Sequence, residues 1–126
     1  MVERRSSHRY SLPLSVTVRP LPLDSTSEFN VTTLDVSSGG LYFTSMQRLS
    51  TGNKLDLAVT LPSEATAGST ITIDVQAHVL RVDDMPGGVL GIAVMIDKLN
   101  VSRAAVDFAL HRAEAATATR GSVARA

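Results

Sequence analysis

Apolar and polar residues alternate along most of the chain, which is the period of β-strands with one buried face. From Leu12 to Val18 every second residue is apolar, and Pro20 and Pro22 then stop the run. Further strand-like runs follow, separated by Ser-, Gly- and Asp-rich segments: 29–35, 55–61 and 71–79 alternate, and 41–43 and 89–96 are mostly apolar. The pattern therefore predicts six short strands joined by turns.

The longest alternating run predicts one buried and one exposed face on a single strand. Its apolar positions are Ile71, Ile73, Val75, Ala77 and Val79, and Asp74, Gln76 and His78 occupy the other face. Arg81 has the parity of the apolar face, so it either ends the strand or points into the mouth of a barrel. The last run, 89–96, is almost entirely apolar, which predicts a strand buried on both sides.

A single helix is expected after the strands. Asn100 can cap it, and its expected interior positions are Val101, Ala104, Ala105, Val106, Phe108, Leu110 and Ala113. Few large apolar residues follow Leu110, so we expect fraying beyond about Ala116 and a disordered tail at residues 117–126. Six strands followed by one helix indicate an all-β-dominated fold, a six-stranded antiparallel barrel with a C-terminal α-helix over one opening.

Composition narrows the chemistry. The chain has 126 residues, enough for one domain, and 44% of them are hydrophobic. It has no cysteine, which excludes disulfides, thiolate metal sites and cysteine nucleophiles. The three histidines have no ligand spacing, so we expect no metal and no cofactor. No run approaches the roughly 18 apolar residues of a membrane span, and we expect a soluble, cytoplasmic protein without membrane insertion.

Charge is concentrated near the start of the chain, although the formal net charge is zero. Residues 1–12 contain three arginines, Arg4, Arg5 and Arg9, against one acidic residue, Glu3. A broad basic face, which nucleic-acid binding requires, is not predicted. The small cluster suits one compact anion instead.

Two polar motifs suggest what that anion is. Residues Arg5 to Arg9 read RxxxR, and residues Asp35 to Gly40 read DxSxxG, with predicted strand structure between them. Both motifs, in this order and before this strand pattern, resemble the PilZ domain family of bacterial receptors for the second messenger cyclic di-GMP (c-di-GMP). The resemblance implies three parts: an arm at residues 1–11, the barrel with its helix at 12–116, and the tail at 117–126.

The resemblance also implies which residues bind the ligand. Arg5 and Arg9 would hold a phosphate or the O6/N7 edge of a guanine, because a guanidinium presents forked donors. Asp35 would accept the guanine N1–H and exocyclic amine. Ser37 would supply a hydroxyl, and Gly39 and Gly40 would turn the backbone with positive φ.

Further expectations concern the arm and the rim of the site. In the family, an arginine at the position of Arg4 tends to accompany two intercalated ligand molecules. His8 and Arg81 are peripheral candidates. Because residues 1–11 show no apolar anchor, we expect the arm to be mobile when the site is empty and ordered over the barrel when it is filled.

Three other functions were weighed. A PilZ-fold interaction module that does not bind c-di-GMP is the main alternative, since each motif alone is common in turns and basic termini. A hydrolase is not expected, because Ser37 lacks a nucleophile-elbow pattern and a paired histidine. Nucleic-acid binding through only three arginines would be weak. We therefore expect a non-enzymatic receptor or adaptor, with a downstream protein partner that the sequence does not identify.

Overall fold

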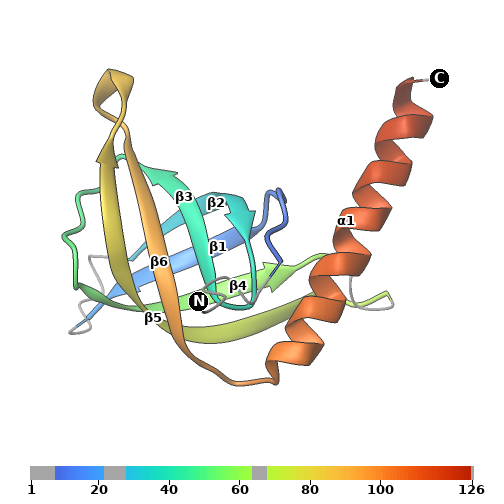
Figure 1. Ribbon diagram of the computed structural model, residues 1–126, viewed down its shortest axis with the longest axis horizontal. Coiled ribbons are helices and arrows are strands. Elements are labelled where there is room, and N and C mark those ends of the chain that lie inside the picture. The colour runs from blue at the N-terminus through green and yellow to red at the C-terminus, as the bar shows by residue number, and fades with distance from the viewer. Residues whose placement is uncertain (1–7, 22–27, 64–67, 126) are drawn as a thin grey trace, which may run out of the picture.

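The computed structural model describes residues 8–21, 28–63 and 68–125, with side chains described as far as Ala116. Its strands close into one antiparallel barrel in the order β1-β2-β3-β6-β5-β4, and the helix α1 lies at one end of the barrel and extends past it (Figure 1). The elements are β1 (Ser15–Pro20), β2 (Phe29–Val36), β3 (Gly40–Ser45), β4 (Lys54–Leu61), β5 (Ile71–Asp84), the 3-10 turn η3 (Pro86–Gly88), β6 (Leu90–Leu99) and α1 (Arg103–Arg125). The predicted fold class is confirmed.

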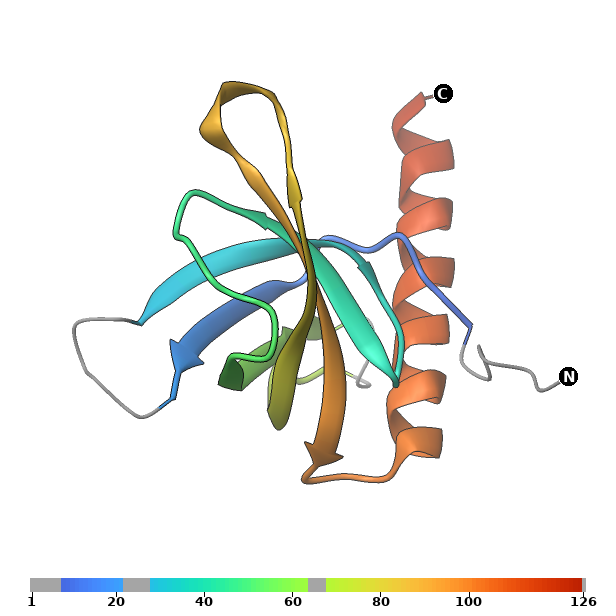
Figure 2. The same ribbon diagram turned by 60° about the vertical axis from the view of Figure 1, so that its left-hand side comes forward.

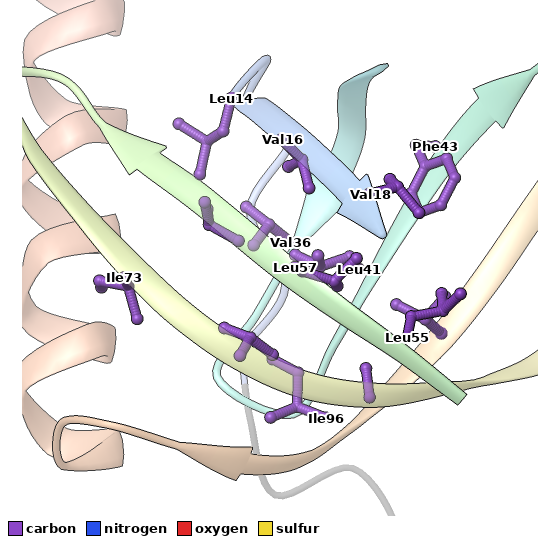
Figure 3. Close-up of a cluster of buried hydrophobic side chains, with 14 of the residues drawn as sticks. Leu14, Val16, Val18, Val36, Leu41, Phe43, Leu55, Leu57, Ile73 and Ile96 are labelled. Carbon is purple, nitrogen blue, oxygen red and sulfur yellow. The ribbon is translucent and has the colours of Figure 1, made fainter. Parts of the chain in front are cut away.

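The core follows from the alternation of the strands. Their inward side chains meet along the barrel axis, with Phe43 and Leu55 fully buried (Figure 3). On β5 the buried set begins at Ile73, whereas Ile71 is exposed, so the expectation that Ile71 belongs to the buried face is wrong. Ile71 is the first residue of β5 and pairs with Leu61, the last residue of β4, so it lies where the ladder ends.

Bulges in the strand pairing change which side chains face outward. On β5 the pairing with β6 shifts between Val79 and Arg81, so Leu80 is the additional residue. One extra residue reverses the alternation beyond it. Arg81 therefore lies on the outside of the barrel with 59% of its side chain exposed, and it neither ends the strand nor points into the barrel mouth. A second shift on β2, between Thr33 and Asp35, likewise leaves Leu34 exposed.

The segment before β1 is attached to the barrel. Tyr10 forms a bridge with Val36 in which each backbone N–H donates to the other residue's carbonyl, at 2.8 and 2.9 Å. The Tyr10 side chain is only 6% exposed and belongs to the hydrophobic core. The expectation that residues 1–11 contain no apolar anchor is therefore wrong, because Tyr10 supplies one.

The helix α1 begins later than expected. Ser102 caps it, since the Ala105 N–H donates to the Ser102 Oγ at 3.1 Å, and Asn100 lies before the first turn. Its buried face consists of Val106, Ala109, Leu110 and Ala113. Val101, Ala104, Ala105 and Phe108, expected in the interior, are exposed instead.

The helix also ends later than expected. It continues beyond Ala116 to Arg125. The division of the chain into arm, domain and tail stays a prediction. Among the described residues, no helix is both long enough and apolar enough to cross a membrane.

Candidate functional site

Backbone pairing brings the two motifs together. The Tyr10–Val36 bridge places Arg9 beside Asp35, and the Arg9 Nη1 lies 3.8 Å from the Asp35 Oδ1. Both side chains reach solvent, with 52% of Arg9 and 33% of Asp35 exposed. Arg4 and Arg5 lie outside the described residues. The last residue of RxxxR and the first of DxSxxG therefore form one surface of opposite charges.

Asp35 retains an unused acceptor. Its Oδ1 is buried and accepts no hydrogen bond from the part of the chain that the structure describes. The approach of Arg9 at 3.8 Å is an ion pair but is too long for a hydrogen bond. Buried carboxylate oxygens normally have hydrogen-bond donors, so this atom has an acceptor position open to a donor from outside the described residues.

The hydroxyl of Ser37 shapes the loop of the second motif. The Ser37 Oγ accepts hydrogen bonds from the N–H groups of Gly39 and Gly40, each at 3.1 Å. The Ser37 N–H donates to the Gly40 carbonyl at 2.9 Å, and the side chain is buried. A serine at this spacing thus closes the turn from within.

Glycine is needed at position 40 for space. Gly39 and Gly40 are not among the positive-φ glycines of the described chain, which are Gly52, Gly68, Gly87 and Gly88, so that expectation is wrong. A Cβ on Gly40 would lie 2.6 Å from the Val94 carbonyl oxygen, because β3 and β6 approach closely there. Position 40 must therefore lack a side chain.

The substitution Gly40→Ala is expected to cost about 1–3 kcal/mol of stability, because the obstructing atom is backbone within a ladder and cannot rotate away. Urea unfolding measures the loss. Equal stability of Gly40→Ala and the unmodified protein would contradict the steric argument.

Strand pairing extends the surface from Asp35 across the barrel. Asp35 pairs with Tyr42, Tyr42 with Ala93, and Ala93 with Arg81. The four residues make a row over β2, β3, β6 and β5. In the adjacent row Gly40 pairs with Met95, which is exposed. The outer face beside the DxSxxG loop is thus partly apolar.

Arg81 is held at the far end of this row. Its Nε donates to both carboxylate oxygens of Asp83 at 3.1 and 3.2 Å, and the Tyr42 hydroxyl donates to Asp83 at 3.2 Å. The guanidinium carbon lies 5.9 Å from the centre of the Tyr42 ring. Sequence reasoning missed Tyr42 and Asp83, since only the strand register brings them to Arg81.

The family of the chain follows from its sequence profile. The family model of the PilZ domain matches residues 3–108, which include both motifs. The chain belongs to the PilZ domain family. A comparison with curated proteins found no match.

Several solved structures have the same fold. The inhibitor of motility MotI/DgrA of Bacillus subtilis is 19% identical with a TM-score of 0.70, over 88% of this chain and 50% of its own. The PilZ domain of YcgR from Escherichia coli, solved with c-di-GMP, is 16% identical with a TM-score of 0.63, over 93% and 98%. Apo MrkH of K. pneumonia is 16% identical with a TM-score of 0.57, over 99% and 54%. This PilZ domain thus spans about half of MotI/DgrA and MrkH.

Ionisation in the Tyr42 cluster of this PilZ domain follows from its contacts. The hydrogen bond from Arg81 is the main cause that lowers the pKa of Asp83. Burial, followed by the hydrogen bond to Asp83 and its charge, raises the pKa of Tyr42 above 10.0. The cluster therefore keeps a carboxylate and a neutral phenol side by side at neutral pH.

Both tyrosines of the PilZ domain are expected to ionise at higher pH in the folded than in the unfolded chain. Burial, then the charges of Asp107 and Glu114, raises the pKa of Tyr10 as well. A raised folded pKa contributes stability that is complete below about pH 10 and is lost as pH rises through the folded values. Tyrosinate absorbance in alkaline titrations, with and without denaturant, measures the difference.

The control for this titration is Tyr42→Phe, which removes one of the two tyrosines. The remaining transition should belong to Tyr10 and stay above the unfolded one. Coincident titration curves for the folded and the unfolded chain would contradict the prediction.

The histidines of this PilZ domain have separate surroundings. His8 packs edge-on against Tyr10, with ring centroids 4.5 Å apart. The His78 Nδ1 lies 2.9 Å from the Asp97 Oδ2 on the outer face, and His111 is exposed on α1. Within residues 8–21, 28–63 and 68–125, no group of three or more His, Cys, Asp or Glu side chains could hold a metal ion. The histidines therefore do not form a common site.

Proposed function

We propose that this PilZ domain is a receptor for c-di-GMP, bound where Arg9 meets Asp35. The observation that carries the proposal is the Arg9–Asp35 ion pair of 3.8 Å, with a buried Asp35 oxygen that accepts no hydrogen bond from the described residues. It joins the two motifs that the family match covers. The c-di-GMP-bound YcgR domain has the same fold and supports the proposal.

The ligand chemistry fits these groups. Arg9 is half exposed, so its guanidinium can turn toward a phosphate or the O6/N7 edge of a guanine. Asp35 then accepts the guanine N1–H and amine, two donors that adenine does not present together on that edge. We assign guanine selectivity to Asp35 for this reason.

The remaining motif residues have supporting parts in the proposal. Ser37 fixes the turn, and Gly39 and Gly40 let the ligand approach the backbone. By analogy with the family motif, Arg4 and Arg5 of the arm would contact the ligand together with Arg9. His8 precedes Arg9 in the sequence and is a peripheral candidate. Arg81, held by Asp83 over Tyr42, is a peripheral contact at the end of the outer row.

The proposed role is regulatory and not catalytic. The site groups are suited to hold an anionic nucleotide, and we place the protein in the cytoplasm, where it would act through a protein partner. The structural similarity to an inhibitor of motility supports an adaptor role. Ordering of the arm over the barrel is the proposed signal, and Tyr10 is its fixed end.

The test is a calorimetric titration of the purified protein with c-di-GMP, with cyclic di-AMP and GTP as controls. We expect saturable binding of c-di-GMP alone, with two ligand molecules per chain if Arg4 adds an intercalated pair. One molecule per chain would reject the intercalated pair. No binding would reject the receptor and leave a PilZ-fold interaction module.

A further inference from the structure

The helix α1 is attached to the DxSxxG loop by one side chain. Arg103, the first residue of α1, donates a hydrogen bond from its Nη1 to the carbonyl oxygen of Ser38, in the middle of the loop. The two residues are 65 positions apart in sequence. Arg103 belongs to neither motif, so the sequence did not single it out.

The geometry on both sides of this bond is defined. Ser102 caps the helix, which fixes the backbone from which Arg103 extends. Ser38 is 1% exposed, so the carbonyl that accepts the bond belongs to a buried residue of the loop. A guanidinium that donates to a carbonyl makes a charge-assisted hydrogen bond, which is stronger than a neutral one.

Arg103 adds to the other bonds that hold the loop. Ser37 closes the turn from within, and the Ile96 N–H of β6 donates to the Gly39 carbonyl at 2.9 Å. Arg103 adds a hold at Ser38 that comes from a different element, the first turn of α1.

The apolar contact between α1 and the barrel involves few large side chains. Two of its four buried helix residues are alanines, Ala109 and Ala113. An apolar cavity of about 20 Å³ lies at this seam, lined by residues that include Ser37, Val106 and Leu110. The bond from Arg103 adds a specific polar contact between the first turn of α1 and the loop to this apolar packing.

We propose that Arg103 is a positioning residue of the ligand site, which fixes the DxSxxG loop through Ser38 and ties α1 to it. The part of this inference that is tested by ligand affinity rests on the proposed function, the binding of c-di-GMP. Without the bond the loop is less restrained, so part of the binding free energy is used to order it and the affinity falls. Ligand binding in turn holds the Ser38 carbonyl in place for Arg103, so the site and α1 stabilise each other.

The test compares Arg103→Met, Arg103→Lys and the control Arg112→Met. Arg112 lies on the same helix, where its guanidinium stacks on Phe108. Arg103→Met should weaken c-di-GMP binding by about five- to tenfold. Arg103→Lys should recover part of the affinity, and Arg112→Met should bind like the unmodified protein.

Hydrogen exchange of the Gly39 and Gly40 amides in the ligand-free protein is the second readout. It should be faster in Arg103→Met and unchanged in Arg112→Met. This readout separates the two proposals, since it is measurable even if the unmodified protein does not bind c-di-GMP. Unchanged loop exchange in Arg103→Met, or equal acceleration in Arg112→Met, would overturn the positioning role.

Discussion

Replacing Arg9 with alanine is expected to weaken c-di-GMP binding by about ten- to one hundred-fold, the effect of losing one charge-assisted hydrogen-bonding group. The fold should persist. Arg9 is 52% exposed and its ion pair with Asp35 spans 3.8 Å, so the pair adds little to stability. Calorimetry measures the affinity, and thermal unfolding checks the fold.

The matched control for Arg9 is Arg19→Ala. Arg19 is also an exposed arginine in an ion pair, with its Nε 3.2 Å from the Glu28 Oε1, but it lies on β1 and outside both motifs. Its loss should leave c-di-GMP affinity unchanged. If Arg9→Ala binds as tightly as Arg19→Ala, the assignment of the RxxxR motif to the ligand fails.

Replacing Tyr10 with alanine is expected to lower both stability and affinity. Removal of a buried aromatic ring costs about 3–5 kcal/mol in a core that cannot collapse around it. Tyr10 adjoins Arg9, and its ring is the apolar anchor of the segment, so an alanine leaves only the backbone bridge to Val36 to keep Arg9 beside Asp35. Urea unfolding and calorimetry measure the two effects.

The variant Tyr10→Phe shows whether the effects on stability and affinity come from the ring or from its hydroxyl. It keeps the ring in the core and the backbone bridge, so stability and affinity should stay close to those of the unmodified protein. The anchor role is wrong if Tyr10→Ala retains full affinity under conditions in which it remains folded.

The barrel was predictable because its local and global patterns agree. Alternation in each run matches an inward face, and turn formers separate the runs. The parity of Arg81 was not predictable. The bulge at Leu80 is a property of the pairing between β5 and β6, and neither strand alone specifies it.

The site was predictable only in part, since a motif names residues but not their surroundings. The proximity of Arg9 and Asp35 agrees with the motif reading. Tyr10 carried a signal that was overlooked, because it continues the alternation of Leu12 and Leu14 into the arm. Gly40 was expected for its φ, but its need for space comes from the approach of β6, which is a tertiary contact.

The additional residue at Leu80 determines which parts of the β5–β6 hairpin tolerate a change in length. One further residue inserted after Leu80 would shift the frame of the strand, turning Arg81 and Asp83 toward the core and Val82 toward water, whereas deletion of Leu80 itself would only restore regular alternation. Charged side chains in place of an apolar one are among the most costly changes a core can undergo. Length changes in relatives should therefore concentrate at the Met85–Val89 tip, where Gly87 and Gly88 already form an exposed turn.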